Sequence, residues 1–238
     1  MSSASSEDSS SGLNRRGDSG VKERMRIVQR ARSRIYDAAI VGLTADWYRA
    51  VLERLPEGCR LLDIGIGTGS ALLANAATVR ARRIQVTGLD IDADYIARCQ
   101  REVAARGLDA FIAPRLESVY DHRGGPYDAA YFSASFMLLP EPEAALRHVR
   151  SLLTPGARIY FTQTFEHAPS RAVELVKPLL RLVTTIDFGR VTYEADFRRA
   201  LGAGGETLEA LETISPGARR SGVLAVSAAG GRAIQDPG

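Results

Sequence analysis

The sequence predicts an α/β fold with a doubly wound, mostly parallel sheet of seven strands whose last strand is antiparallel. Three observations favour this fold. Short apolar runs alternate with helical patterns between residues 60 and 164, which is typical of parallel strands joined by crossover helices. A glycine-rich turn follows the first of these runs. Two further apolar runs near the carboxyl terminus are joined by a link so short that the strands must be antiparallel.

The individual elements are read from periodicity and from the turn residues that separate them. Apolar runs bounded by turns predict strands at residues 60–64, 84–89, 110–116, 127–132, 158–164, 208–214 and 223–227. Helical spacing of apolar residues predicts helices at residues 21–35, 43–55, 70–79, 93–106, 142–153, 170–183 and 193–201. A Pro-Glu-Gly turn stops the second helix, and a Thr-Pro-Gly turn stops the fifth.

The chain of 238 residues suits one medium-sized domain. Residues 1–20 are rich in serine and poor in apolar side chains, so we predict a disordered tail there. Residues 21–230 then form a single domain, with an amino-terminal helical cap at residues 21–56. The helix at residues 21–35 is strongly basic. It fits either a solvated helix docked on the domain, or a lid or a contact with an anionic surface.

Composition bounds the class of protein. Apolar residues make up 45% and charged residues 25%, as in ordinary globular proteins. No apolar run approaches the roughly 20 residues that a membrane span needs, and the amino terminus lacks the apolar core of a secretory signal. Cys59 and Cys99 are far apart, which predicts neither a disulfide scaffold nor a metal site. We therefore expect a cytoplasmic protein; the net charge of +3 and the sequence leave the oligomeric state open.

The first strand leads into a glycine-rich turn, LLDIGIGTG at residues 61–69. Glycines at a strand-to-helix turn permit positive φ and let the backbone approach a ligand. The helix that follows directs its free N–H groups at the same place. The spacing differs from the G-x-G-x-x-G fingerprint of dinucleotide-binding proteins, because Ser70 stands after the third glycine. A plain tight turn is the alternative for this segment taken alone.

An acid closes the second predicted strand. Asp90 stands 21 residues after Gly69, where Rossmann-type folds place an acid that accepts hydrogen bonds from both ribose hydroxyls. The alternative is that it caps the next helix, a role that Asp92 fills equally well. The glycine turn and the acid together, in register with a strand–helix–strand pattern, are far more specific than either alone.

These segments resemble the class I S-adenosylmethionine-dependent methyltransferases over roughly residues 36–227. Residues 61–69 resemble the family's first motif, and GLDI at residues 88–91 resembles its second. Residues 127–139 resemble its fourth-strand segment, and LLTPG at residues 152–156 resembles the turn before its fifth strand. The resemblance implies a Rossmann-like methyltransferase fold, S-adenosylmethionine as the cofactor, and transfer of its methyl group.

The resemblance assigns the methionine half of the cofactor to the glycine turn. Asp63 would orient the loop and the methionyl amine. The other loop residues would line the methionine moiety; they are Gly65, Gly67, Thr68 and Gly69. Ser133, at the end of the fourth strand, would lie beside the sulfonium.

The adenosine half is assigned to the following strands. Asp90 would hold the ribose, and Ile91 would pack on the adenine. Where the family often has an Asp beside the adenine amine, this chain has Glu117-Ser118, and the longer Glu can accept the same hydrogen bond. Tyr36 resembles a tyrosine that closes over the cofactor in quinone-biosynthesis and phospholipid methyltransferases; a core aromatic is the equal alternative.

The methyl acceptor is predicted by exclusion. Residues 133–136, SASF, stand where enzymes acting on exocyclic base amines carry an Asn-Pro-Pro-Tyr-like tetrapeptide, and no Pro-Cys nucleophile or three-carboxylate metal site is evident. A small molecule methylated on oxygen or nitrogen is therefore the predicted acceptor. Its pocket is expected to be covered by the amino-terminal helices and residues 167–197. Positioning suffices for an amine, whereas a hydroxyl wants a base. His122 and His167 are candidates because each is expected at the carboxyl end of a strand, and His148 is expected at the surface.

Other functions stay open at this point. An RNA- or other macromolecule-directed methyltransferase rests on the basic helix, although nucleic acid is the less expected partner. A non-catalytic scaffold would have no physical need for the glycines and Asp90. An NAD-dependent dehydrogenase is disfavoured by the glycine spacing.

Overall fold

The computed structural model describes residue 42 and residues 44–166, 192–217 and 220–229. The predicted tail, the basic helix with Tyr36, and His167 with the helix at residues 170–183 lie outside the described residues.

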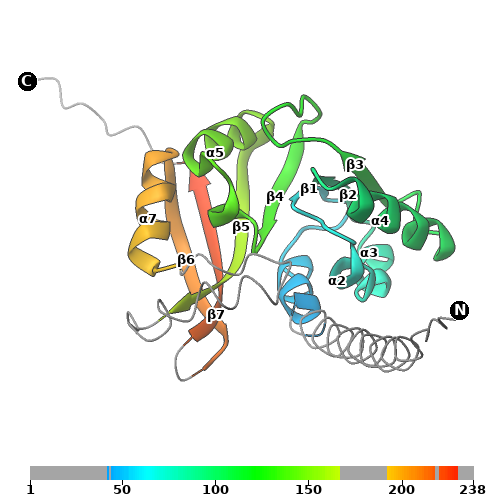
Figure 1. The fold of residues 1–238 in the computed structure, drawn as a ribbon, viewed down its shortest axis with the longest axis horizontal. Helices are drawn as coiled ribbons and strands as arrows, with labels where there is room; N and C mark the ends of the chain where they lie inside the picture. The colour runs from blue at the N-terminus through cyan, green and yellow to red at the C-terminus, as the bar shows by residue number, and fades with distance from the viewer. Residues whose placement is uncertain (1–41, 43, 167–191, 218–219, 230–238) are drawn as a thin grey trace, which may run out of the picture. The chain divides into compact units, whose positions relative to one another are not determined.

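One seven-stranded sheet, with the order β3-β2-β1-β4-β5-β7-β6, organises the described chain (Figure 1). Its strands are β1 (Arg60–Ile64), β2 (Gln85–Asp90), β3 (Ile112–Leu116), β4 (Tyr127–Ser133), β5 (Leu153–Glu166), β6 (Glu206–Ser215) and β7 (Arg220–Ala229). The first five strands pair in parallel, and β7 runs antiparallel to both β5 and β6. The predicted fold class is confirmed.

Helices pack on both faces of the sheet, as a doubly wound fold requires. The first core joins the helix at residues 44–52 with α2 (Ser70–Leu73), α3 (Ala76–Ala81) and α4 (Ala93–Ala105). The second joins the short 3-10 helix η1 (Phe136–Leu138), α5 (Pro142–Ser151) and α7 (Glu194–Ala203). Side chains alternate along the central strand β1, so Leu61 belongs to the first core and Leu62 to the second. Because β1 is buried on both faces of the sheet, its residues are mostly apolar.

Two predicted elements differ most from the structure. The helix expected at residues 70–79 is divided into α2 and α3 at Asn75, whose buried side-chain amide donates to the carbonyl oxygens of Ala45 at 2.8 Å and Ala71 at 3.0 Å. Strand β5 begins five residues earlier than predicted, because Leu153 already pairs with Tyr127. The Thr-Pro-Gly segment lies at a register shift in the pairing of β4 with β5. These residues, which end a helix, are therefore part of strand β5 in the structure.

Candidate active site

The strand order creates a switch point between β1 and β4. From β1 the chain continues to β2 on one side of the sheet centre, while β4 and β5 lie on the other. Ligands of open α/β sheets bind at such a point, outside the carboxyl ends of the strands. The turn after β1, at residues 65–69, lies there (Figure 1).

The three glycines of the turn all have the left-handed backbone that the sequence predicted. Their φ angles are 84° at Gly65, 58° at Gly67 and 69° at Gly69. The N–H groups of Gly65 and Ile66 donate to the carbonyl oxygen of Leu89 at 2.8 and 3.1 Å, which ties the turn to the end of β2.

The glycines differ in what surrounds them. A Cβ on Gly65 would lie 2.6 Å from Cβ of Ser135, and a Cβ on Gly69 would lie 2.5 Å from Sγ of Cys99. A Cβ on Gly67 would have no neighbour within 4 Å among the described residues. Gly65 and Gly69 therefore allow the protein to pack closely, whereas Gly67 borders the space in which a ligand can approach the backbone.

The packing at Gly69 gives a testable coupling. We expect Gly69→Ala to lower the free energy of unfolding by about 2–4 kcal/mol, through overpacking against Cys99 and the positive φ. The double variant with Cys99→Ala should recover about 1–2 kcal/mol of that loss, because the clash is removed while the φ strain remains. Urea denaturation of the two single variants and the double variant measures this coupling; strictly additive losses would contradict it.

Asp63 lies fully buried in β1 beneath the turn. The hydroxyl of Tyr48, from the helix at residues 44–52, donates to its Oδ2 at 2.8 Å, while Oδ1 has no hydrogen-bond partner in the described structure. Burial raises the pKa of Asp63 to about 7; the Tyr48 hydrogen bond opposes this rise, and the charge of Asp90 adds to it. A buried carboxylate oxygen without a donor is a place where a cationic ligand group would be stabilised.

A buried polar network supports Asp63 from three elements. The ring of Tyr48 meets the ring of Tyr131 edge-on, with centroids 4.9 Å apart. The hydroxyl of Tyr131, on β4, lies 2.6 Å from Oγ1 of Thr162 on β5. Sequence reasoning missed both tyrosines, since a lone aromatic in an amphipathic helix or an apolar strand carries no signal beyond burial.

Asp90 braces the turn rather than capping a helix. Its Oδ2 accepts from the N–H of Gly67 at 2.9 Å, and its Oδ1 accepts from the N–H of Asp92 at 2.9 Å. Asp92 is the residue that caps α4, accepting from the N–H groups of Asp94 and Tyr95. A carboxylate offers about four lone-pair sites, so Asp90 keeps acceptor capacity for two ligand hydroxyls.

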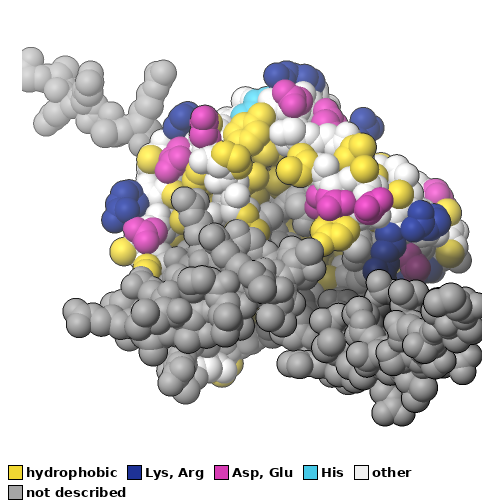
Figure 2. Space-filling model, in the orientation of Figure 1, with side chains coloured by type: hydrophobic (Ala, Val, Ile, Leu, Met, Phe, Trp, Pro, Cys, Tyr) yellow, Lys and Arg dark blue, Asp and Glu magenta, His cyan; other side chains and the backbone are white. Residues whose placement is uncertain are grey.

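The ends of β2 and β3 expose apolar side chains beside acidic ones. Ile91 is 79% exposed and Leu116 is 57% exposed. The N–H of Glu117 donates to the carbonyl oxygen of Asp90 at 3.0 Å, so the two strand ends lie together. Ser118 uses its hydroxyl and carbonyl within the turn after β3. Figure 2 shows acidic and hydrophobic side chains side by side on the viewed face.

The serines and the threonine of the site lie around the loop. Oγ1 of Thr68 is 2.9 Å from Oγ of Ser70 at the start of α2. Ser133 ends β4, half-buried and paired in register with β5. Ser135 was missed by sequence reasoning; its hydroxyl donates to the carbonyl oxygen of Ile64 and thereby holds the β4 end against the turn.

The structure places His122 between the end of β3 and the start of β4. The segment after β3 runs back toward the start of β4, and the His122 ring is buried there, with Nε2 2.8 Å from the hydroxyl of Tyr127. Tyr127 is the first residue of β4, and Nδ1 of His122 lies 2.9 Å from Oε2 of Glu117 directly after β3, so the ring bridges these two segments. His148 is half-buried rather than a plain surface residue, and its Nε2 contacts the carbonyl oxygen of His122 at 2.8 Å.

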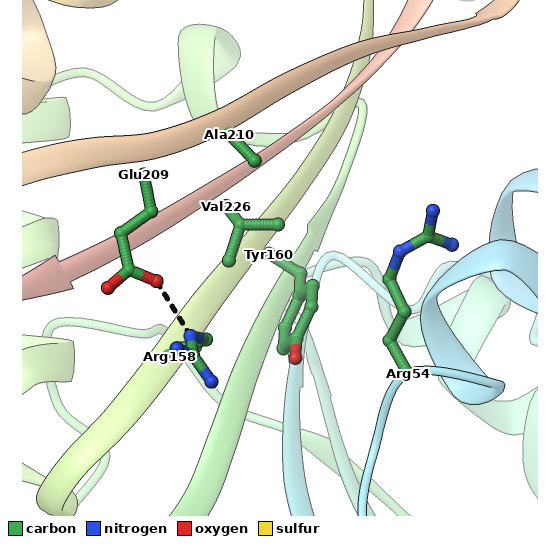
Figure 3. A pocket seen from close by; sticks show the side chains of 6 residues that line it. All are labelled: Arg54, Arg158, Tyr160, Glu209, Ala210 and Val226. Carbon is green, nitrogen blue, oxygen red and sulfur yellow. Dashed lines mark hydrogen bonds and ion pairs between the residues drawn. The ribbon is translucent and has the colours of Figure 1, made fainter.

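A shallow hollow lies on a different part of the sheet (Figure 3). Its lining comes from the early part of β5, from β6 and β7, and from Arg54: it comprises Arg54, Arg158, Tyr160, Glu209, Ala210 and Val226. Both arginines are already ion-paired, Arg158 with Glu209 at 2.6 Å and Arg54 with Glu212 at 2.7 Å. The hollow therefore does not belong to the site at the glycine turn.

Comparison with known proteins agrees with this geometry. Residues 62–159, which hold the turn, Asp90 and Glu117, match the family described as a methyltransferase domain. The match agrees with the strand order. Residues 62–159 are thus similar to a methyltransferase domain.

Individual relatives match part of this domain. Demethylmenaquinone methyltransferase of Thermus thermophilus is 30% identical over 52% of this chain and 54% of its own length. A tRNA 5-carboxymethoxyuridine methyltransferase of Escherichia coli K12 is 30% identical over 48% of this chain and 43% of its own length. The chain thus spans about half the length of these curated relatives.

Solved structures share the fold at low sequence identity. The [4+2]-cyclase SpnF superposes with a TM-score of 0.63 and 19% identity, covering 78% of this chain and 81% of that one. Geranyl diphosphate methyltransferase in complex with SAM has a TM-score of 0.61 and 13% identity, with 77% and 84% covered. Among the residues that the structure describes, no helix is long and apolar enough to cross a membrane, and no cluster of three or more His, Cys, Asp or Glu could hold a metal ion.

Proposed function

We propose that this chain transfers a methyl group from S-adenosylmethionine to a small-molecule acceptor, on an oxygen or a nitrogen atom. The residues at the turn fit the cofactor in three ways. Asp63 offers a buried unpartnered oxygen to the methionyl amine, the space at Gly67 admits the methionine chain, and the exposed Ile91 offers an apolar surface to the adenine. When bound, S-adenosylmethionine supplies an activated methyl group, so the protein's task is chiefly to bind and orient.

The remaining roles in this proposal follow the strand ends. Asp90 accepts the ribose hydroxyls while it braces the turn. Glu117, with Ser118 beside it, receives the adenine amine. Ser133 lies beside the sulfonium. The methionine moiety is lined by Gly65, Gly67, Thr68 and Gly69. Tyr36 is proposed to close over the cofactor.

The observation that carries the choice of acceptor is a buried donor near the carboxyl end of β5. Nε2 of Gln163 is buried and has no hydrogen-bond partner in the described structure. Gln163 has the same parity in β5 as Phe161 and Phe165, so it shares their face of the sheet. An enclosed donor of this kind favours a compact ligand that bears oxygen atoms.

An RNA acceptor is the second candidate, because one of the relatives is named as a tRNA methyltransferase. RNA-binding domains usually gather Lys and Arg on one face. Figure 2 instead shows basic side chains scattered among acidic and hydrophobic ones on the described surface in view. On the described part of this face, the mixture of charges favours the small acceptor.

Product formation tests the choice. S-adenosylhomocysteine release is measured with the full chain against small phenols, hydroquinones, carboxylic acids and amines, and against total tRNA. We expect turnover with a small acceptor and none with tRNA. Gln163→Leu should raise the KM for that acceptor roughly tenfold, the value of about one hydrogen bond to a buried group, and leave cofactor affinity unchanged. Methyl incorporation into tRNA without turnover of any small acceptor would overturn the proposal.

A further inference from the structure

We infer that His122 is a positioning residue for adenine recognition: it clamps one oxygen of the Glu117 carboxylate, so that the other is presented to the adenine amine. The inference rests on the proposed placement of adenine at Glu117. It concerns a residue that lies outside the glycine turn.

The clamp is a chain of two hydrogen bonds. Nδ1 of His122 lies 2.9 Å from Oε2 of Glu117, and Nε2 lies 2.8 Å from the hydroxyl of Tyr127. An ionised carboxylate only accepts hydrogen bonds, so Nδ1 must carry the proton that is donated to Glu117. In the neutral ring Nε2 then accepts from the Tyr127 hydroxyl, and this second bond fixes the tautomer. Among the described residues no hydrogen bond engages Oε1 of Glu117, which leaves that oxygen for a ligand.

The imidazole is held where it is by its surroundings. It is 2% exposed, whereas the Glu117 side chain is 29% exposed, so the clamp reaches from the interior to an accessible carboxylate. The backbone N–H of His122 donates to the carbonyl oxygen of Ser118 at 3.1 Å. A Cβ on Gly124 would lie 2.6 Å from Nε2 of His122, so only glycine leaves room for the bond to Tyr127.

The clamp compensates for the greater flexibility of Glu117 compared with the shorter Asp that the family often has at this position. A glutamate has one more rotatable bond, and ordering such a side chain costs up to about 1.5–2 kcal/mol. A hydrogen bond from a buried and immobile ring orders the carboxylate before the ligand arrives, so that cost is not charged against binding. Glu117 is also tied through its own N–H to the carbonyl of Asp90, which places the adenine acceptor next to the ribose acceptor.

Two substitutions of His122 separate the clamp from packing. In His122→Asn the side-chain amide can take the place of Nδ1 and keep the bond to Glu117. In His122→Gln the amide takes the place of Nε2, so it keeps the bond to Tyr127 and loses Glu117. Both variants remove the ring and leave a similar cavity, and they differ in which hydrogen bond survives.

The readout is the preference for the adenine amine. Calorimetry on the full chain compares S-adenosylhomocysteine with S-inosylhomocysteine, in which a carbonyl oxygen replaces the amine. We expect the parent protein to prefer the amine at least about tenfold, the value of one hydrogen bond to a charged group. His122→Asn should keep this preference, while His122→Gln and Glu117→Ala should reduce it to about threefold or less without weakening the inosine analogue. Tyr127→Phe should lower thermal stability and leave most of the preference.

Each other outcome has a distinct meaning. Equal preferences in the Asn and Gln variants would overturn the clamp, as would a parent protein that binds S-adenosylhomocysteine without preferring the amine; the proposed function would stand in both cases. No binding of S-adenosylhomocysteine to the parent protein would instead overturn the proposed function. Glu117→Ala changes an accessible side chain, so it reports on the amine even where a substitution of the buried ring prevents folding.

Discussion

Replacing Asp63 with Asn is expected to weaken S-adenosylmethionine binding and, at the same time, to remove a stability penalty that the ligand-free protein carries at alkaline pH. The carboxyl group is fully buried, one of its oxygens has no partner in the described structure, and burial raises its pKa to about 7. Ionising such a group is costly in the ligand-free protein, and a cation that binds beside it reduces this cost.

The direction of the pH effect follows from linkage. In the unfolded chain this group has the ordinary pKa of 3.8, against about 7 in the folded protein. Between these values the folded state holds the proton more tightly, so the stability from this group is complete below pH 4 and is lost as pH rises through 7. The loss is about 2–4 kcal/mol at pH 8. Asn cannot ionise, so the variant lacks the loss.

The measurement compares the change in unfolding free energy between pH 5 and pH 8 in the variant with the same change in the parent. The cost of burying the Asn amide does not depend on pH, so it cancels in this comparison. Unfolding of the ligand-free protein by urea is followed at pH 5 and pH 8 for Asp63→Asn and the parent. Moving from pH 5 to pH 8 should shift the comparison by about 2–4 kcal/mol in favour of the variant. Tyr48→Phe is the control. The Tyr48 hydrogen bond lowers the pKa of Asp63, so removing it should raise that pKa further. The loss of stability with rising pH should then extend to higher pH than in the parent protein.

Binding should change in the opposite sense. Loss of a charge-assisted hydrogen bond to the methionyl amine costs about 1.5–3 kcal/mol, or roughly 10- to 150-fold in Kd. In the parent protein the affinity should rise with pH up to about 7, because the ligand binds the ionised form of Asp63. Asp63→Asn should show no such rise. A variant that binds as tightly as the parent at pH 8 would remove Asp63 from the cofactor site.

The strands and the turn could be predicted because their signals are local. Positive φ at Gly65, Gly67 and Gly69 follows from residue type at a strand-to-helix turn, and the parallel pairing of the first five strands follows from the crossovers that the alternating pattern implies. The continuation of β5 through Pro155 could not be predicted, because it depends on pairing with β4, which no local pattern records.

The parts of the site that sequence reasoning missed are held by contacts between distant segments. Tyr48 reaches Asp63 across 15 positions of sequence, and Ser135 reaches Ile64 across 71. His122 follows β3 in sequence, but its place in the sequence does not reveal that the ring also contacts Tyr127 at the start of β4. Residue type and spacing identify what a turn can bind, and tertiary contacts decide which neighbours support it.

Replacing Asp90 with Ala should reduce cofactor affinity far more than the same change at its neighbour Asp92. Both are acids between the end of β2 and the start of α4, two positions apart. Asp92 caps the helix, and its oxygen accepts from the N–H groups of Asp94 and Tyr95 at 2.9 and 3.0 Å. Asp90 accepts instead from the N–H of Gly67 at 2.9 Å, the one loop glycine that borders open space.

The matched pair therefore separates ligand binding from helix stability. Asp92→Ala should cost about 1 kcal/mol of unfolding free energy, the usual value of a helix cap, and change Kd by less than about threefold. Asp90→Ala should lose the proposed bonds to both ribose hydroxyls and the brace on the turn, which together are worth about 2–4 kcal/mol, or roughly 30- to 1,000-fold in Kd. Calorimetric titration with S-adenosylhomocysteine and urea denaturation of both variants provide the comparison. Equal affinity losses would show that α4 acts through its stability alone, and an unchanged Kd in Asp90→Ala would place the ribose elsewhere.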